Sequence, residues 1–261
     1  MPDMSSNPQS RDDVAWNPTE LAENPHQSTE KAGKVRSMFA SIAGSYDLNN
    51  RLHSFGLDQS WRKRTVALAG VRDGDAVLDM ACGTGDLTEA FLRTGAAEVI
   101  GGDFTPEMLD QARRKAARLP EGARPVYEHA DAMNLEYEDQ RFDVVTIAFG
   151  IRNVTDPAIA IREFARVLRP GGRLVILEFA EPRNPFIRWG NRFYTMRVMP
   201  WTASMVARDG SGAYRYLPRS IETFLDPEQL AALMRGAGFV VKRQVPLTFG
   251  VCVASLGVRE S

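Results

Sequence analysis

Two glycines, and an acidic residue 20 positions after the first of them, are the strongest indications of a ligand site in this sequence. Gly83 and Gly85 lie in VLDMACGTGD, residues 77–86, where an apolar run ends in a turn. Glycine lets the backbone approach a ligand closely, and the helix expected to follow offers unpaired amide groups. Asp103 ends the next apolar run, EVIGGD, where a carboxylate can accept hydrogen bonds from both hydroxyls of a ribose. The pattern predicts a nucleoside site.

The same turn argues against a dinucleotide. A dinucleotide site has the pattern G-x-G-x-x-G, and Thr88 stands where the third glycine would be. Asp86, at the start of the helix, would repel a pyrophosphate, and Asp79 adds a second acidic group. S-adenosylmethionine fits better, because it joins an adenosine to an ammonium and a sulfonium and carries no phosphate. A glycine-rich turn that binds nothing is the alternative.

Later strand ends supply further candidates. Asp131 can accept a hydrogen bond from an adenine amino group while the amide of Ala132 donates to the ring. In FGIRNVTDP, Arg152 and Asn153 would lie beside the reacting centre, and the alternative is a pair that only stabilises its loop. We interpret Cys82 as a small residue in a tight turn rather than a nucleophile. His129 is interpreted as a packed or solvent-facing side chain.

Strands that alternate with helices would bring these residues to one edge of a sheet. Five β-branched apolar runs separated by helical segments predict a doubly wound, mostly parallel sheet of the α/β class, which binds ligands at the carboxyl ends of its strands. Two more runs, FVVKRQVPL and VCVASLGV, complete seven strands and predict an antiparallel edge hairpin around residues 248–250. Helices are expected to begin at three prolines that follow a capping residue: Pro106, Pro157 and Pro227.

Three segments fall outside this alternation. Residues 1–33 are rich in Asn, Pro, Ser and Gln and predict a disordered tail, with docking of Trp16 and Leu21 as the alternative. Residues 34–70 carry two amphipathic segments, which we expect to form a helical cap across one edge of the main domain. Residues 183–222 interleave aromatic residues and methionines with arginines. A connection this long in a compact domain is functional or has structure of its own.

Length and composition restrict the class of protein. The chain has 261 residues and a formal net charge of −1, so a single domain over residues 34–261 is expected and a generally basic nucleic-acid binder is not. Its two cysteines indicate a reducing, cytoplasmic setting. No cluster has the spacing of a metal site, and no apolar run approaches the roughly 20 residues of a spanning helix.

From about Val35 to its carboxyl end, the chain resembles the ubiquinone/menaquinone biosynthesis C-methyltransferases, which have the class I, Rossmann-like, S-adenosylmethionine-dependent fold. The resemblance rests on IAGSYDLNNRLHSFGLDQSWRK, VLDMACGTGDL, FGIRNVTD, RVLRPGGRLVILEF and SMVARDGSGAYRYLPRSI. FGIRNVTD and AYRYLPRSI are the more specific motifs. The chain departs at Ala148, where relatives often have Ser, and in its last segment, LTFGVCVASLGVRES.

The resemblance implies C-methylation of a polyprenyl quinol, either demethylmenaquinol or 2-polyprenyl-6-methoxy-1,4-benzoquinol. It implies S-adenosylmethionine contacts at Thr84, Asp103, Asp131 and Ala132, beside the contacts expected from the residues at Asp79, Gly83 and Gly85. It also points to Arg152, with Asn153 orienting it. Because the pKa of an arginine lies above 12, we favour stabilisation of a phenolate over a role as base.

The insert at 183–222 would then cover the isoprenoid tail and contact the inner face of the membrane, and a plain lid or homodimer contact is the alternative. Two other functions stay open: a methyltransferase for another phenolic lipid or small molecule, and a non-catalytic subunit that binds S-adenosylmethionine in a quinone-synthesis complex. A nucleic-acid methyltransferase is disfavoured, because the charges balance and the chain has no Asn-Pro-Pro-aromatic motif for a flipped base.

Overall fold

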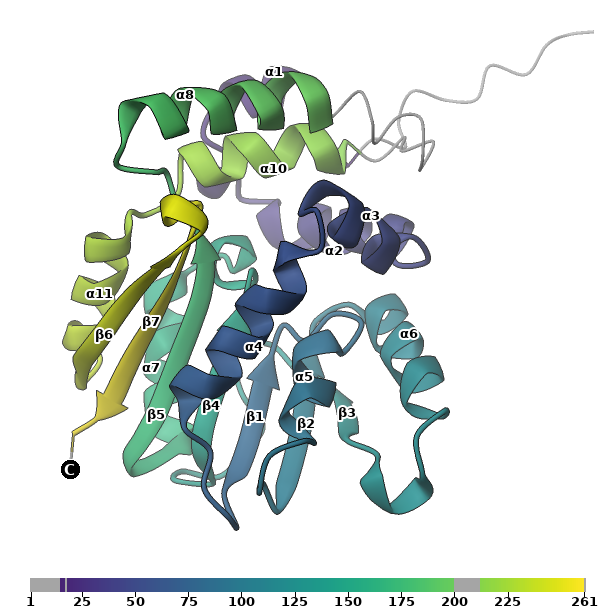
Figure 1. The fold of residues 1–261 in the computed structure, drawn as a ribbon, viewed down its shortest axis with the longest axis vertical. Coiled ribbons are helices and arrows are strands. Elements are labelled where there is room, and N and C mark those ends of the chain that lie inside the picture. The colour runs from purple at the N-terminus through teal and green to yellow at the C-terminus, as the bar shows by residue number, and fades with distance from the viewer. Residues whose placement is uncertain (1–14, 17, 200–211, 261) are drawn as a thin grey trace, which may run out of the picture.

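The computed structural model describes residues 15, 16, 18–199 and 212–260 (Figure 1). Expectations for residues 1–14, and for Trp201 and Met205 of the insert, lie outside these ranges. At the centre is a seven-stranded sheet in the order β3-β2-β1-β4-β5-β7-β6. Its strands are β1 Ala76–Met80, β2 Glu98–Asp103, β3 Val126–His129, β4 Phe142–Ala148, β5 Leu168–Phe179, β6 Phe239–Leu247 and β7 Cys252–Arg259.

The strand directions confirm the predicted α/β class. The first five strands pair in parallel, and β7 pairs antiparallel with both β5 and β6. A short 3-10 turn, η6 (Thr248–Gly250), joins the edge hairpin where the sequence predicts it. From β1, the chain continues to β2 and β3 on one side of the sheet. It then returns to β4, which lies on the other side of β1. This switch point opens a crevice at the carboxyl ends of β1 and β4.

Helices cover both faces of the sheet, and consecutive strand residues supply the two cores. Val77 and Val144 pack with α4 (Leu57–Ala69) and α5 (Asp86–Phe91) on one face. Leu78 and Val145 pack with α7 (Pro157–Val167) and α11 (Pro227–Gly236) on the other. All four strand side chains have no exposed surface, which is why the central runs are apolar without a break. On the described residues, no helix combines the length and the apolar character needed to cross a membrane.

The three proline-led helices begin where predicted. Asp156 accepts from the first amides of α7, and Asp226 forms a complete capping box with Gln229 at the start of α11. The third, α6 (Pro106–Ala116), differs, because the side chain of Thr105 makes no capping bond. Its backbone amide donates to Asp103 instead, so this helix start is tied to the end of β2.

The predicted disordered tail is wrong where the structure describes it. Residues before 34 form α1 (Pro18–Ala22), η2 (Pro25–Gln27) and the first turn of α2 (Lys31–Ile42). Trp16 is fully buried and stacks on Tyr216 of α10 (Ala213–Glu222), with ring centroids 4.9 Å apart. Local sequence gave no sign of this contact because its partner lies at the other end of the chain. The alternative, docking of Trp16 and Leu21, is the arrangement observed.

The helical cap expected at residues 34–70 differs from the prediction in where its helices lie. It consists of α2, α3 (Tyr46–His53) and α4, and α4 lies on a face of the sheet rather than across its edge (Figure 1). Helices α2 and α3 lie above the carboxyl ends of the strands. The insert has structure of its own, as predicted: α8 (Pro185–Phe193), the π-helical turn η5 (Tyr194–Val198) and α10 form a further layer above them.

Replacing Trp16 with Ala should loosen the amino-terminal helices from α10, because the buried stack of Trp16 on Tyr216 is removed. We expect amide hydrogens of α1 and η2 to exchange about tenfold faster or more, with those of the central strands unchanged. Hydrogen exchange followed by mass spectrometry measures both. Trp189→Ala is the matched control, since Trp189 is exposed. Equal protection in the two variants would show that other contacts hold the segment.

Candidate active site

Two pockets meet above the carboxyl ends of the strands. The inner pocket, with an empty volume of about 820 Å³, lies over β1, β2 and β4. The outer pocket, of about 1160 Å³, lies between the amino-terminal helices and the insert. Phe39, Tyr46 and Phe149 line both, so the two spaces meet at these three rings. Among the described residues, these aromatic side chains therefore form the junction between the two pockets.

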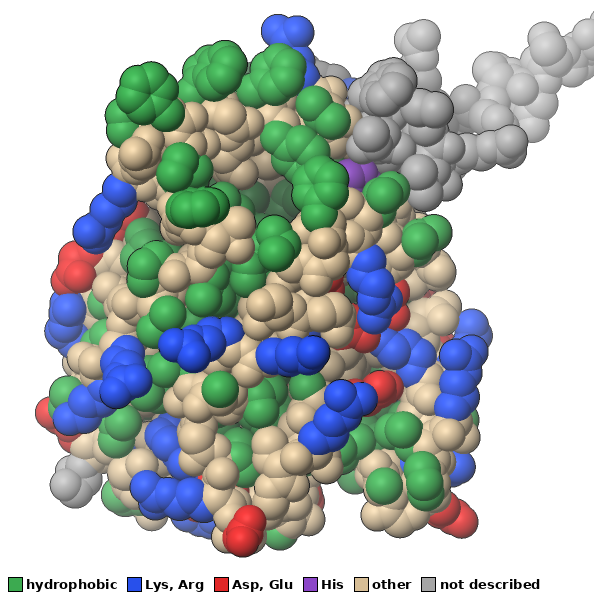
Figure 2. Space-filling model, in the orientation of Figure 1, with side chains coloured by type: hydrophobic (Ala, Val, Ile, Leu, Met, Phe, Trp, Pro, Cys, Tyr) green, Lys and Arg blue, Asp and Glu red, His purple; other side chains and the backbone are tan. Residues whose placement is uncertain are grey.

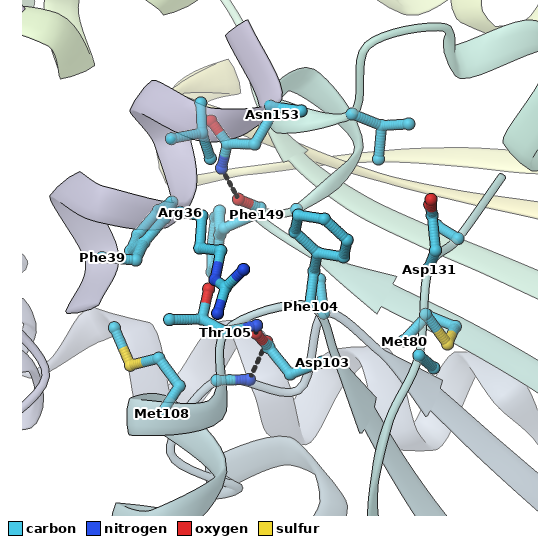
Figure 3. A pocket seen from close by; sticks show the side chains of 18 of the residues that line it. Arg36, Phe39, Met80, Asp103, Phe104, Thr105, Met108, Asp131, Phe149 and Asn153 are labelled. Atoms are coloured by element: carbon cyan, nitrogen blue, oxygen red, sulfur yellow. Dashed lines mark hydrogen bonds between the residues drawn. The ribbon is translucent and has the colours of Figure 1, made fainter. Parts of the chain in front are cut away.

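Asp103 is held at the floor of the inner pocket by two backbone amides. Gly83 donates to Oδ2 at 2.8 Å, and Thr105 donates to Oδ1 at 2.8 Å (Figure 3). The side chain is buried, and burial raises the pKa of Asp103 against the opposing effect of these two amides. Each carboxylate oxygen keeps a further lone pair, so the group can accept hydrogen bonds from neighbouring hydroxyls. Its contact with a ribose stays a prediction.

The backbone conformation of the turn explains its two glycines. Gly85 has φ +88°, and a Cβ there would come within 2.1 Å of the Tyr127 hydroxyl. Gly83 has φ +57° and lines the inner pocket. Gly85 and Thr84 belong to the same turn but not to the lining residues. Thr84 donates its hydroxyl to Asp47 of α3, so in this structure it ties the turn to the cap. Their contact with a cofactor stays a prediction.

Asp131 and Ala132 also line the inner pocket. Oδ1 of Asp131 accepts from the amide of Met133 at 2.9 Å, which fixes the carboxylate at the end of β3. Phe104 and Met80 supply apolar surface between Asp131 and Asp103 (Figure 3). Acidic groups at both ends of an apolar slot suit an adenosine, whose hydroxyls and amino group are donors.

Asp79 lies behind the pocket instead of in its lining. It is buried and accepts from the hydroxyls of Thr88 at 2.7 Å and Thr146 at 2.8 Å. Burial raises its pKa to about 6, and the two hydroxyl donors oppose that rise. Asp79 thus joins β1, α5 and β4 beneath the turn. A direct cofactor contact by Asp79 stays a prediction.

Several lining residues of the inner pocket come from α2, which the sequence did not place. Arg36 points its guanidinium into the pocket, toward Asp103 (Figure 3). Phe39, one turn further, closes the same side. Helical spacing around these residues showed an amphipathic helix, but only its position over the strands makes them part of a site.

Arg152 lies in the wall of the outer pocket and is buried with a carboxylate. Its Nη1 donates to Glu178 Oε1 at 2.8 Å and to the carbonyl of Phe149 at 2.7 Å. Its guanidinium also stacks over the ring of Phe179, 5.4 Å from the centroid. Within the described part of the chain, no hydrogen bond uses Nη2. Arg152 therefore stabilises its loop and also presents a donor edge.

Asn153 falls on the other pocket. It lines the inner pocket, and its amide group donates to the same Phe149 carbonyl at 3.2 Å. Its Oδ1 accepts from the hydroxyl of Tyr216 at 3.0 Å. The sequence treats Arg152 and Asn153 as one pair, but the structure places them on opposite sides of Phe149, joined through its carbonyl.

A second buried ion pair, which sequence reasoning missed, lines the outer pocket. Arg62 Nη1 lies 3.3 Å from Asp58 Oδ2, both on α4, and the guanidinium sits over the ring of Phe149 at 5.6 Å. The i, i+4 spacing of the two residues was visible in the sequence, but such pairs usually lie on a solvated face. Trp61 and Phe179 give the outer pocket aromatic walls. Arg62 and Arg152 each bury a guanidinium group in it.

Cys82 and His129 are the two residues for which the sequence favours a role other than chemistry. Burial raises the pKa of the Cys82 thiol well above its ordinary value, which favours the structural role expected for it. His129 is exposed, so it faces solvent, and its ring centroid lies 5.6 Å from that of Phe104.

Comparison with known proteins finds relatives that align along most of the chain. The model of the ubiE/COQ5 methyltransferase family matches residues 27–259. The demethylmenaquinone methyltransferase of Thermus thermophilus is 48% identical over 223 residues, covering 85% of this chain and 100% of that protein. That of Deinococcus radiodurans is 44% identical, covering 85% and 91%. The ubiquinone/menaquinone biosynthesis C-methyltransferase UbiE of Saccharophagus degradans is 40% identical, covering 88% and 93%.

Solved structures of low identity share the fold. A SAM-dependent methyltransferase from Thermotoga maritima superposes with a TM-score of 0.60 at 19% identity, covering 87% of this chain and 100% of that one. The [4+2]-cyclase SpnF superposes with a TM-score of 0.65 at 16% identity, covering 88% and 96%. The predicted class I fold is thereby confirmed.

Asp103→Ala should weaken S-adenosylmethionine binding by about tenfold to a hundredfold, because hydrogen bonds to a charged acceptor are lost. Isothermal titration calorimetry measures the affinity. Asp103→Asn, which keeps the size of the side chain, separates lost acceptors from a collapsed turn, and Asp110→Ala is a control for charge on exposed α6. Unchanged affinity in the folded Asp103 variants would rule out a ribose contact.

Proposed function

The chain belongs to the ubiE/COQ5 methyltransferase family, and from this membership we propose that it methylates a ring carbon of a polyprenyl quinol, with S-adenosylmethionine as the methyl donor. One observation carries the proposal: the inner and outer pockets meet at Phe39, Tyr46 and Phe149. The inner pocket has the acidic floor that suits a nucleoside without phosphate. The outer pocket has aromatic walls and buried guanidinium groups that suit an oxygen-bearing aromatic ring.

Asp103, Asp131 and Ala132 are the residues that we propose to hold the adenosine, with Gly83 leaving room for it. When bound, S-adenosylmethionine supplies a methyl group on a positively charged sulfur, which a carbon nucleophile can displace. The three aromatic rings at the junction exclude water from the path between the pockets. They also restrict the orientation of a flat ring, so that its carbon is held at near-attack distance.

Arg152 is the residue that we propose to act on the quinol. A ring carbon is a better nucleophile when the adjacent hydroxyl has lost its proton, and a fixed guanidinium stabilises the resulting phenolate. Glu178 and the Phe149 carbonyl hold Nη1, which leaves the Nη2 edge for the phenolate oxygen. The bond between sulfur and methyl breaks, and the sulfur becomes a neutral thioether. The methylated carbon then gives its proton to solvent, and the ring becomes aromatic again.

Asn153 then acts as a positioning residue. Its amide and the Arg152 guanidinium donate to one carbonyl, so a shift of either side chain moves that shared acceptor. Arg62, held by Asp58, is placed to bind the second oxygen of the quinol. A guanidinium near each oxygen would explain why a chain with balanced charge buries two arginines in one pocket.

Demethylmenaquinol is the substrate that we favour. The Thermus and Deinococcus relatives are named for demethylmenaquinone alone. Their sequence identity to this chain, 48% and 44%, is higher than the 40% of the Saccharophagus relative, whose name includes ubiquinone. The benzoquinol precursor is the second candidate. In both molecules the reactive part is an oxygen-bearing ring with a prenyl tail, so the two candidates share the chemistry of the outer pocket.

The proposal is tested by incubating the protein with methyl-labelled S-adenosylmethionine and chemically reduced demethylmenaquinol or 2-polyprenyl-6-methoxy-1,4-benzoquinol in parallel. We expect labelled menaquinol, and less product or none from the benzoquinol. Mass spectrometry of the extracted lipid locates the label on the ring. If cofactor binding is confirmed and neither quinol is labelled, another phenolic lipid or a non-catalytic role takes the place of this function.

Arg152→Ala should lower kcat by about a hundredfold or more while the affinity for S-adenosylmethionine stays nearly unchanged. The reason is that Arg152 lines the outer pocket and not the inner one. Arg152→Lys keeps a charge beside Glu178 and guards against misfolding, and Arg235→Ala on the surface is the control. A large loss of cofactor affinity instead would make Arg152 a cofactor ligand.

A further inference from the structure

One face of α8 exposes a continuous apolar stripe. Phe186, Trp189, Phe193 and Met196 are 84%, 72%, 55% and 51% exposed. Their spacing of three, four and three residues places them on one side of the helix that continues through η5. Hydrophobic side chains gather at the top of the molecule in Figure 2, over the position of α8 in Figure 1. Soluble proteins rarely leave such large aromatic groups uncovered in a row.

The other face of the same helical segment lines the outer pocket. Asn191, Tyr194 and Thr195 belong to the pocket lining, and they alternate along the helix with the exposed stripe. This segment therefore forms a wall with the pocket on one side and the apolar stripe on the other. The stripe is beside the pocket rather than at a remote part of the surface.

Two other elements next to the outer pocket also expose a phenylalanine. Phe55, between α3 and α4, is 77% exposed and lies 5.6 Å from the ring of Tyr194. Phe249, in η6, is 80% exposed and lies two residues from Val251 of the pocket lining. Both have positive φ, 54° and 57°, which costs a non-glycine residue free energy. We name these two residues and the α8 stripe the apolar rim.

The charge around the stripe is positive. Residues 183–199 contain four arginines and no acidic residue, in a chain whose net charge is −1. Arg188 and Arg192 have acidic neighbours outside this segment, Glu181 and Glu222. Arg183 and Arg197 are exposed. Aromatic side chains flanked by arginine are typical of helices that lie in the interface of an anionic membrane.

We infer that the apolar rim docks on the surface of an anionic lipid bilayer, with the outer pocket beside the acyl region. The inference rests on the proposed function for its purpose, because a polyprenyl quinol dissolves in the bilayer and must reach the pocket from there. The binding of the apolar rim to a bilayer is inferred from the exposed side chains and does not depend on the proposed function. A docked protein would meet its substrate by lateral diffusion in the membrane, and the substrate would not have to pass through water.

A second copy of the chain fits this face less well. A two-fold interface would place the stripe of one copy against the stripe of the other. It would also bring the arginines of residues 183–199 toward the same arginines of the second copy, and like charges across an interface are unfavourable. An anionic lipid surface offers apolar depth and negative charge together, so it satisfies both features of the rim.

Vesicle binding without substrate or cofactor is the direct test. The full chain is centrifuged with vesicles of phosphatidylcholine alone or mixed with phosphatidylglycerol. We expect binding to the mixed vesicles that weakens as salt is raised. Phe186→Ser with Trp189→Ser should lower the partition coefficient by about tenfold or more. The matched control, Val126→Ser with Val240→Ser, removes two exposed apolar groups outside the rim and should leave binding unchanged.

Activity separates the docking from the proposed function. With a short-tailed quinol in water, the rim variant should keep the wild-type rate, whereas with a long-tailed quinol in vesicles its rate should fall together with binding. Vesicle binding without methylation of any quinol would leave the docking standing and remove the proposed function. Methylation by a wild-type chain that never binds anionic vesicles would overturn the docking. A dimer in light scattering that the rim variant dissolves would also overturn it, since a second copy would then cover this face.

Discussion

The backbone of Phe149 is the constraint on which both pockets depend. Phe149 follows the last residue of β4 with a φ of +58°, and its amide donates to the carbonyl of Leu177 on β5 at 2.7 Å. Its own carbonyl accepts from Arg152 and Asn153. Its ring lies 4.6 Å from that of Phe179 and separates the inner from the outer pocket. One strained residue thereby sets where the two pockets meet.

Charge is divided between the pockets in the same way. Asp103 is buried at the floor of the inner pocket and Asp79 is buried behind it. Burial raises the pKa of both carboxyl groups, and the charge of Asp103 adds to the rise at Asp79. A floor of this kind favours a ligand with positive charge. The outer pocket instead buries two guanidinium groups, each beside a carboxylate. The polarity therefore changes from acidic to donor-rich across the aromatic junction, which suits a cationic donor below and a phenolic acceptor above.

Helices from the two ends of the chain close the site together. Trp16 stacks on Tyr216, and the hydroxyl of Tyr216 donates to Asn153 at the junction. Lys31 is buried and donates to the carbonyl of Val154, and burial lowers its pKa to about 8. The amino-terminal segment is thus connected to the loop that carries Arg152. A shift of the amino-terminal helices or of α10 would therefore reach that loop through packed side chains.

Features that depend on short-range interactions along the chain could be predicted from the sequence. The parallel strands follow from unbroken apolar runs, the start of α11 from Asp226 and Gln229, and the proximity of the glycine turn to Asp103 from the order of the strands. Each of these is encoded within a few residues, or by the rule that parallel strands end at one edge. The family motif around Arg152 likewise places this residue close to the end of a strand, and its role at a reacting centre stays a prediction.

Tertiary structure alone decided how distant segments complete the site. It placed Trp16 on α10, Arg36 over Asp103, and Glu178 beside Arg152, and it put Asn153 on a different pocket from Arg152. None of these contacts leaves a periodic pattern, because the partners lie on separate elements and their approach depends on how helices pack over the strand ends. Local sequence records which residues tend to be buried, but which residue meets which across the chain is settled only when the whole core forms.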